Sequence, residues 1–462
     1  MKSVLRTRLV WLAVLACAAT AWGGELALDK YVAKPDAAYR FELANTVPGK
    51  GHTVYILKMA SQRWLTKKEV DRPLWEHWVN IVVPDKVRYS TGLLFIGGGK
   101  NGGDVPDGAD EMFRKIAMTT GAVVAELRMV PNQPLVFVGD GRERVEDEII
   151  SYAWNKYLHS LDPKWLPRLP MTKAAVRAMD AVTAFCQSKN VAVDKFIVAG
   201  ASKRGWTTWT TGAVDHRVVA IAPMVIDVLN LEPSMIHHYR SYGFWAPAVG
   251  DYANEGVMDW LGTGAFRSLL KQVDPYEFRQ RFTMPKYLIC AAGDQFFLPD
   301  SSQFYFDKLP GEKYIRYIPN TDHSLDDSDA VEAFAAWMQS ILAGAPRPRF
   351  SWKLAADGSI IVTVRDKPAH VKLWQATNPK ARDFRLETIG KAYTATELKP
   401  SAGGRYIGKA PTPASGWTAF FVELTYPGEG KLPLKFTTQV RVLPDTLPHA
   451  APKPMQRKAA RR

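Results

Sequence analysis

Cysteine is scarce in this sequence of 462 residues: only Cys17, Cys186 and Cys290 are present. Cys186 and Cys290 lie in apolar stretches, which predicts two buried free thiols. The sequence has no Cys/His cluster and no His-Glu-x-x-His pattern, so nothing in it supports a metal site. It also shows no internal repeat. We therefore expect a protein that works with neither a metal nor another cofactor.

Acidic residues are too few to balance the basic ones, and the formal net charge is +14. Eight of the basic residues lie in residues 1–21 and 448–462, which contain no acid, so the remaining body carries only about +6. That excess gives no case for nucleic acid but suits an anionic envelope or a polyanionic substrate. The length, with 47% apolar and 11% aromatic residues, predicts about two or three globular units with a sizeable core.

Long apolar runs are also absent, and the one at the N-terminus, residues 9–17, is too short to span a bilayer. Basic residues precede this run and small residues follow it, which is the order of a signal peptide. We expect residues 1–21 to be removed after Ala21, and the mature protein, without a transmembrane segment, to be periplasmic or secreted. Lipoprotein anchoring through Cys17 is a minority alternative.

Short apolar runs alternate with helical stretches between residues 92 and 319, the pattern of a mostly parallel sheet covered by helices. A long amphipathic stretch, residues 172–188, precedes the third expected strand and predicts a crossover helix. The expected strands are residues 93–97, 122–127, 195–200, 218–226, 286–292 and 313–319. The fold class is therefore α/β.

The alternation lapses over residues 228–282, which are helical in pattern and rich in aromatic residues, and we expect a cap over the edge of the sheet. From residue 346 to 447 alternating runs separated by Pro and Gly predict a small β-sandwich of immunoglobulin or fibronectin type. We thus expect a hydrolase-type domain at 22–345, the β-sandwich at 346–447 and a disordered basic tail at 448–462.

A glycine-flanked serine, Ser202, follows the strand at 195–200 and precedes a segment that can continue as a helix. This is the setting of a nucleophile elbow, in which small neighbours let the entering strand and the leaving helix approach closely. The usual second glycine is one place late here, because Arg204 holds its position and Gly205 follows. Ser202 is the candidate nucleophile.

An acid and a base follow this serine in the order that the α/β-hydrolase fold uses, each just past a strand. Asp294 comes after the strand at 286–292 and His323 after the strand at 313–319. Both strand ends hold the residue type that the chemistry needs, so we predict a triad of Ser202, Asp294 and His323. Asp300 and Asp227 remain alternative acids, and His237 and His238 in the cap rank second as the base.

An oxyanion hole needs the amide after the nucleophile and a second amide from the loop after an earlier strand. Lys203 would supply the first, and the glycine-rich loop with Gly98 and Gly99 would supply the second. Arg204 and the cap residue Trp245 are possible substrate-binding residues, and a buried ion pair is the alternative role of Arg204.

The same loop also matches G-x-G-x-x-G through Gly97, Gly99 and Gly102, with Glu126 placed as a ribose-binding acid would be. A dinucleotide enzyme is the alternative chemistry. It would be unusual in an exported protein, and it leaves the order of Ser202, Asp294 and His323 unexplained.

With these residues in view, the chain resembles the PhoPQ-activated pathogenicity-related protein family, secreted or periplasmic proteins classed with α/β-hydrolases. The resemblance covers about residues 26–442 and implies that Ser202 is the nucleophile and that arginine at 204 is a family trait. A related branch is described as secreted proliferation repressors, so the fold could serve signalling or binding instead. The segments that carry the resemblance are residues 28–32, 61–65, 71–75, 130–135, 146–147, 200–206 and 293–302.

The function we expect is that of an exported serine hydrolase, an esterase rather than a peptidase, working through an acyl-enzyme. The elbow is also distantly similar to those of glucuronoyl and acetyl esterases, which implies a small-molecule or carbohydrate ester as the substrate. The alternative is a catalytically inactive secreted binding protein on the same scaffold. The sequence leaves the oligomeric state open.

Overall fold

The structure, a computed structural model, describes residues 26–453. The expected signal peptide, Cys17 and residues 454–462 of the tail lie outside the described residues. Within 26–453, no helix has the length and apolar character that crossing a membrane requires.

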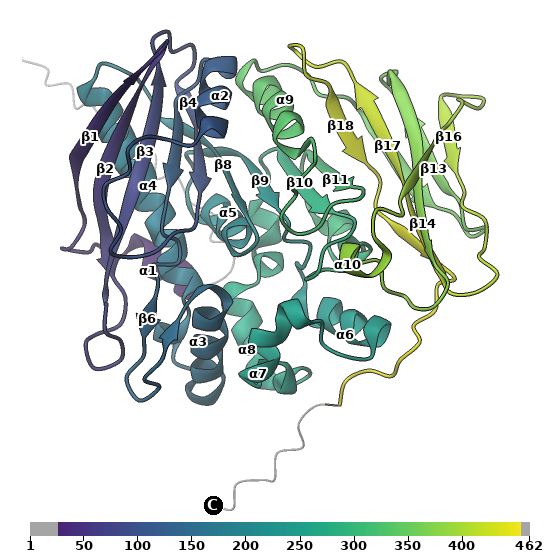
Figure 1. The fold of residues 1–462 in the computed structure, drawn as a ribbon, viewed down its shortest axis with the longest axis horizontal. Coiled ribbons are helices and arrows are strands. Elements are labelled where there is room, and N and C mark those ends of the chain that lie inside the picture. Colours follow the sequence, from purple (N-terminus) through teal and green to yellow (C-terminus); the bar gives the residue numbers. More distant parts are fainter. Residues whose placement is uncertain (1–25, 454–462) are drawn as a thin grey trace, which may run out of the picture.

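A mixed sheet forms the centre of the molecule, and its middle strands are parallel to one another (Figure 1). Their ends agree with the predicted strands to within a few residues, so the predicted α/β architecture is confirmed. In spatial order these strands are β5 (Val124–Leu127), β4 (Thr91–Ile96), β8 (Lys195–Ala201), β9 (Val218–Met224), β10 (Lys286–Ala291) and β11 (Lys313–Ile318).

One edge of this sheet is extended by antiparallel strands from the N-terminal part of the chain. They are β1 (Arg40–Gly49), β2 (His52–Arg63) and β3 (Leu74–Pro84), and β3 pairs with β5. The tight connection between β1 and β2 sets their register, with Gly49 opposite His52.

Helices cover both faces of the sheet, because successive side chains of a strand point to opposite faces. In β8, Phe196 and Val198 belong to one apolar cluster, whereas Ile197 and Ala199 belong to the other. The predicted crossover helix at 172–188 lies within α4. The first cluster includes α4 (Arg168–Ser188) and residues of α1 (Ala27–Ala33) and α5 (Lys203–Val214), and the second includes residues of α2 (Glu111–Thr120) and α9 (Ala330–Leu342).

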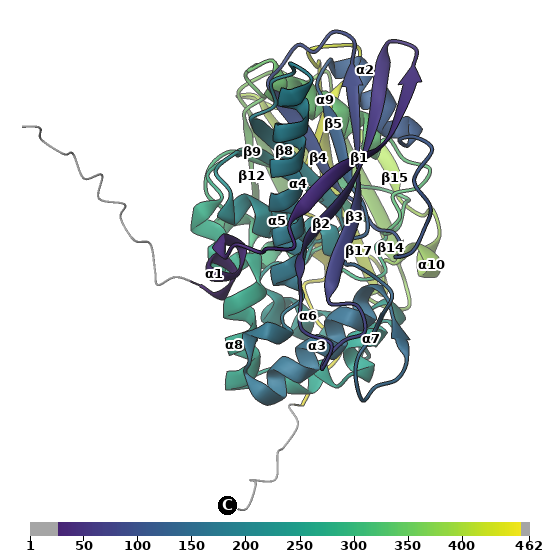
Figure 2. The same cartoon turned by 90° about the vertical axis from the view of Figure 1, so that its left-hand side faces the viewer.

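The cap is helical, as predicted, and lies with α3 at one end of the sheet (Figures 1 and 2). A small hairpin of β6 (Leu135–Val136) and β7 (Glu143–Arg144) leads into α3 (Glu146–Ser160). The cap helices are α6 (Leu231–Tyr242), α7 (Gly250–Asn254) and α8 (Gly264–Val273), with 3-10 turns at Pro247–Val249, Val257–Trp260 and Pro275–Arg281.

The C-terminal domain consists of two packed layers of strands, and so the predicted β-sandwich is present. Ile360 and Val362 of one layer and Phe420 and Val422 of the other share one apolar cluster. One layer contains β12 (Phe350–Leu354), β13 (Ile360–Val364) and β16 (Arg405–Gly408). The other contains β14 (His370–Asn378), β15 (Thr394–Glu397), β17 (Trp417–Tyr426), β18 (Leu434–Thr437) and β19 (Arg441–Leu443), and the short helix α10 (Leu386–Ile389) follows β14.

The two domains share one sheet, because β18 pairs antiparallel with β11 through Thr437 and Ile315. The C-terminal domain is thus continuous with the central sheet. Residues 448–453 belong to the tail that we expected to be disordered, yet they lie against the cap: the amide of His449 donates a 3.0 Å hydrogen bond to the carbonyl of Arg240 in α6.

Candidate active site

Ser202 lies at the turn between β8 and α5, directly before the first residue of the helix. Its backbone has φ 56° and ψ −125°, a combination that residues other than glycine rarely adopt. The Ser202 amide donates a 2.8 Å hydrogen bond to the carbonyl of Met224 at the end of β9, which ties the turn to the neighbouring strand. This strained strand-to-helix turn has the geometry of a nucleophile elbow.

The two glycines beside the elbow are needed for close packing. A Cβ on Gly200 would lie 2.8 Å from the carbonyl oxygen of Arg204, and one on Gly205 would lie 2.9 Å from that of Met224 and 3.0 Å from that of Gly200. The helix therefore lies close against both β8 and β9 at position 205. This explains why glycine stands there and arginine is tolerated at 204.

Asp294 and His323 lie on the loops that follow β10 and β11, and their side chains are in contact. His323 Nδ1 is 2.8 Å and 3.0 Å from the two carboxylate oxygens of Asp294. Oδ1 of Asp294 also accepts the amides of Phe296 at 2.7 Å and Phe297 at 3.3 Å. Donation from Nδ1 to the carboxylate leaves Nε2 as the ring nitrogen that can accept a proton.

Nε2 of His323 is buried and has no hydrogen-bond partner within residues 26–453. In this part of the chain, no hydrogen bond joins it to the hydroxyl of Ser202. The ring of Phe296 packs on the imidazole with a centroid distance of 4.3 Å, and Phe296 lines the same pocket as Ser202. The structure therefore brings the acid and the histidine together and leaves the nitrogen that would face a nucleophile unpaired.

The three amides expected to form an oxyanion hole belong to Gly98, Gly99 and Lys203. None of them donates a hydrogen bond to any residue that the structure describes. The loop after β4 is fixed through other groups, since the amide of Met129 donates to the carbonyl of Gly98 at 2.7 Å. These amides are therefore available to an external acceptor.

The side chains that follow Ser202 form ion pairs with the start of α3. Nζ of Lys203 lies 2.9 Å from Glu146 and 3.0 Å from Asp147, and Arg204 lies 2.6 Å from Glu146. Burial opposes ionisation of Glu146, but the charges of Arg204 and Lys203 outweigh it and lower the pKa of Glu146 to about 2. A Cβ on Gly98 would lie 2.7 Å from the guanidinium of Arg204. Arg204 thus forms a partly buried ion pair with Glu146, whereas a buried ion pair was the alternative role considered from the sequence.

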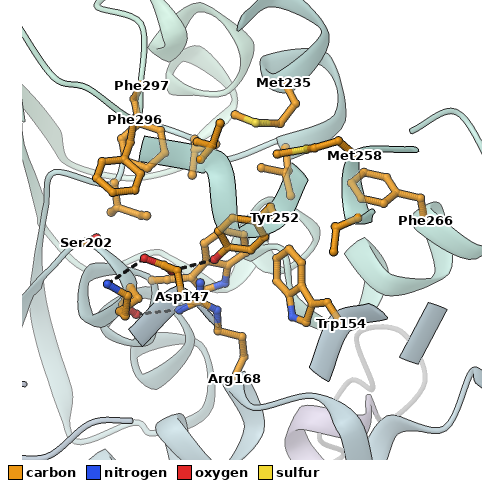
Figure 3. Close-up of a pocket in the computed structure, with 17 residues that line it drawn as sticks. Asp147, Trp154, Arg168, Ser202, Met235, Tyr252, Met258, Phe266, Phe296 and Phe297 are labelled. Carbon is orange, nitrogen blue, oxygen red and sulfur yellow. Dashed lines mark hydrogen bonds and ion pairs between the residues drawn. The ribbon is translucent and has the colours of Figure 1, made fainter. Parts of the chain in front are cut away.

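A pocket opens beside Ser202, with ≈ 590 Å³ of atom-free space including its mouth (Figure 3). Cap residues form much of its wall, and its polar groups lie near the serine. Among these, Asp147 accepts the hydroxyl of Tyr252 at 2.9 Å, and Arg168 donates to the carbonyl of Lys203 at 2.9 Å. The apolar lining residues are Trp154, Trp206, Ile226, Val228, Leu231, Met235, Val249, Val257, Met258, Phe266, Phe296 and Phe297.

The buried Arg168 was not anticipated from the sequence. It packs on the ring of Trp206 at 4.4 Å, is 2% exposed, and its Nε has no partner among the described residues. Burial lowers its pKa. Asp147 and Tyr252 were also not assigned to the site, although residues 146–147 were among the segments that carried the family resemblance.

The alternative acids lie in other networks. Asp227 accepts the hydroxyls of Tyr305 at 2.6 Å and Tyr317 at 2.5 Å, and burial raises its pKa to about 7. Asp300 pairs with Arg382 at 2.5 Å and with His237 at 3.1 Å. Burial works against ionisation of Asp300, but these two partners hold its pKa far below the usual range. Neither carboxylate makes a hydrogen bond to the histidine that Asp294 contacts.

The remaining cap candidates also lie away from Ser202. His238 accepts the amide of Ala246 at 3.1 Å, and burial lowers its pKa to about 3. Trp245 packs on Tyr239 at 5.0 Å and lines a different hollow, which it shares with His449. Within residues 26–453 the structure therefore does not bring Trp245 into the pocket of Ser202.

The glycine-rich loop does not have the dinucleotide-binding arrangement. That motif requires a helix to begin at the loop, but α2 begins only at Glu111, well after Gly102. Glu126 accepts a 3.1 Å hydrogen bond from Asn80 on β3, and burial raises its pKa. The carboxylate of Glu126 is therefore hydrogen-bonded within the sheet, to a side chain of the neighbouring strand β3.

Residues 28–385 match the family described as PhoPQ-activated pathogenicity-related protein. The chain belongs to this family. Autocrine proliferation repressor protein A of Dictyostelium discoideum is 39% identical over 450 residues, which cover 91% of each chain. The resemblance stated from the sequence is thus confirmed.

Two solved structures similar to this family member are acetyl xylan esterases, each 14% identical in sequence. That of Thermoanaerobacterium sp. JW/SL YS485 has a TM-score of 0.46 and covers 68% of this chain and 93% of its own. That of Paenibacillus sp. R4 has a TM-score of 0.47 and covers 69% of this chain and 92% of its own.

Proposed function

We propose that the protein is an exported serine esterase whose nucleophile is Ser202. The observation that carries the proposal is the contact of His323 Nδ1 with Asp294, with Nε2 unpaired among residues 26–453, on a loop at the same end of the parallel strands as the serine elbow. A histidine held in this way is a base whose tautomer is fixed. Packing alone does not require a serine in a strained turn, an oriented imidazole and unpaired amides at the same sheet edge.

In the proposed reaction, Oγ of Ser202 attacks the ester carbonyl carbon while Nε2 of His323 takes the hydroxyl proton. Asp294 stabilises the imidazolium that forms. The amides of Lys203 and of Gly98 or Gly99 donate to the oxyanion of the tetrahedral intermediate. The imidazolium then protonates the alcohol as it leaves. In the second half of the reaction Nε2 of His323 takes a proton from the water that attacks the acyl carbon, and the imidazolium returns that proton to Oγ of Ser202 as the acid is released.

The pocket supports an ester with an apolar acyl group. Met235, Met258 and Phe266, all from the cap, contribute to a wall that is apolar apart from the groups near Ser202. Such a wall binds an acyl chain by removing it from water. We take the alcohol part to be a small molecule or a carbohydrate.

Export is part of the proposal. It rests on residues 1–21, in which basic residues are followed by an apolar run and then by small residues. Membership of the family is consistent with export. N-terminal sequencing of the protein recovered from outside the cytoplasm should begin at Trp22. Recovery of the uncleaved chain from the cytoplasm alone would contradict this part.

The deciding experiment is labelling of the purified mature protein with a fluorophosphonate probe. Wild type should be labelled, and Ser202→Ala and His323→Ala should not, because the probe reacts with an activated serine. Ser188→Ala, at the end of α4, is the matched control and should label like wild type. Absence of labelling in folded wild type would refute the mechanism.

A second function is supported by the relative from Dictyostelium discoideum, whose name describes a repressor of proliferation. In that case the protein would be a secreted signalling or binding protein on an inactive hydrolase scaffold. The missing hydrogen bond between Ser202 and His323 in the described structure favours this alternative. The same labelling experiment separates the two functions.

A further inference from the structure

A segment of the C-terminal domain, residues 382–393, lies against the loops that follow β10 and β11. We call it the clamp segment. It includes α10, which lies near the ends of β10 and β11 and close to α6 in Figure 1. The two loops it contacts are those that carry Asp294 and His323.

The clamp segment holds the loop of Asp294 through the main chain. The amide of Leu386 donates a 2.9 Å hydrogen bond to the carbonyl of Gly293, the residue before Asp294. A Cβ on Gly293 would lie 3.0 Å from that amide nitrogen, so the approach requires glycine. The hydroxyl of Tyr393 also lies 3.5 Å from the carbonyl of Ala292.

The loop of His323 is held by a reciprocal pair of hydrogen bonds. Nδ2 of Asn320 donates to the carbonyl of Tyr393, and Oδ1 of Asn320 accepts the amide of Tyr393, both at 2.9 Å. Asn320 has φ 56°, a left-handed conformation in which asparagine is favoured over most residues. The two loops are joined directly as well, because the amide of Gly293 donates to the carbonyl of Thr321 at 3.2 Å.

The other end of the clamp segment reaches the cap. Arg382, which is 2% exposed, pairs with Asp300 and donates to the hydroxyl of Ser241 in α6 at 3.0 Å. Asp300 is also bound to His237 of α6. One segment thus connects the loop of the acid, the loop of the histidine and the helix that covers the pocket.

We propose that the clamp segment is a positioning element that keeps the side chains of Asp294 and His323 in contact. The C-terminal domain then completes the active site and does not act as a separate binding module. The inference rests on the proposed function. Imidazole and carboxylate come from different loops, and their contact depends on how those loops are fixed. The bonds that Tyr393 makes to Asn320 and that Leu386 makes to Gly293 supply that fixing from outside the hydrolase domain.

The test is the variant Asn320→Gly. It removes both bonds to Tyr393 and keeps the left-handed backbone without strain, because glycine adopts positive φ freely. Asn190→Gly is the matched control, since Asn190 also has a left-handed backbone, with φ 59°, and lies exposed at the end of α4. The full mature chain is used for both variants.

Two readouts are measured. Hydrogen–deuterium exchange followed by mass spectrometry reports on residues 292–298 and 319–325 whether or not the protein is an enzyme. We expect faster exchange in both peptides for Asn320→Gly and not for Asn190→Gly. For hydrolysis of 4-nitrophenyl esters we expect kcat to fall by about 10- to 100-fold with little change in KM, because the loss is one of orientation and not of substrate binding.

The outcomes distinguish a failure of the positioning role proposed for the clamp segment from a failure of the proposed esterase activity. If Asn320→Gly matches Asn190→Gly in exchange, or if exchange rises while kcat is unchanged, the positioning role is overturned although the esterase proposal stands. If wild type neither labels nor hydrolyses esters, the esterase proposal fails, and with it the positioning of a catalytic pair. Faster exchange together with a fall in kcat supports the clamp.

Discussion

The most demanding prediction concerns the variant Asp294→Asn. In the structure the amides of Phe296 and Phe297 donate to Oδ1 of Asp294, so an asparagine would place its oxygen there and its NH2 group at the position of Oδ2. That position lies 2.8 Å from Nδ1 of His323. Two donors would then face each other, and Oδ1, which is 3.0 Å from Nδ1, already accepts two amides, so we expect the imidazole to place its proton on Nε2. The base would be in the tautomer that cannot accept a proton from serine.

The expected loss follows from that tautomer. Replacing the triad acid by its amide lowers kcat by about 10⁴-fold in a well-studied serine protease, which corresponds to about 5.5 kcal/mol of transition-state stabilisation. We expect about 10³- to 10⁴-fold for Asp294→Asn. The assay is the rate of 4-nitrophenyl ester hydrolysis together with the rate of fluorophosphonate labelling, with thermal unfolding as the check on folding.

Asp227→Asn and Asp300→Asn are the matched comparisons, because they are the two other acids that the sequence left open. Neither contacts His323, so their effects on the chemical step should be far smaller once the folded fraction is taken into account. If Asp227→Asn abolishes hydrolysis while Asp294→Asn retains most of it, the acid is Asp227. The inference from the Nδ1 contact is then wrong.

Three further predictions concern the pocket, the elbow and a buried acid. Met258→Trp should shift the preference of 4-nitrophenyl esters towards shorter acyl chains by filling the pocket, and the exposed Met118→Trp should not. Gly205→Ala should lower the free energy of unfolding in urea by about 1–3 kcal/mol through its 2.9 Å clash, whereas Gly103→Ala, with nothing within 4 Å, should be near neutral. The raised pKa of Asp227, about 7, means that the folded state binds more protons than the unfolded state between about pH 4 and 7. Stability should therefore fall as pH rises through this window, and Asp227→Asn should reduce that fall, as measured by thermal unfolding at a series of pH values.

The strands and the order of candidate residues were predictable because each depends on local patterns. The apolar runs that became β8, β10 and β11 are short and buried on both faces, as strands in the middle of a parallel sheet are. The elbow followed from a serine between small residues at the end of such a run. These signals required no knowledge of which strands are neighbours.

The pocket could not be predicted in the same way, because its residues come from segments far apart in the chain. Asp147 is the second residue of α3, Arg168 begins α4 and Tyr252 lies in α7, and only the fold brings them beside Ser202. Trp245 shows the converse: an aromatic residue in the cap lines a different hollow. Composition could not separate these cases, since both kinds of residue lie in helical, partly apolar stretches.

The choice among three carboxylates also needed the structure. All three follow buried strands or lie on the same loops, so sequence position leaves them equivalent, whereas their partners differ. Asp227 is bound by two tyrosines, Asp300 by an arginine and a cap histidine, and Asp294 by a histidine and two amides. Of the three, only Asp294 contacts His323, the histidine that follows β11.

Phe296 connects the acyl pocket to the proposed base. Its ring packs on His323 at 4.3 Å and also lines the pocket, and its amide holds Asp294. An acyl group that fills the pocket would therefore touch the ring that packs on the imidazole. Hydrogen bonds in a catalytic site often tighten only when substrate is bound. Within residues 26–453 neither Nε2 of His323 nor the hydroxyl of Ser202 has a hydrogen-bond partner, which is consistent with a pair that closes in this way, with Phe296 as the contact through which binding would act.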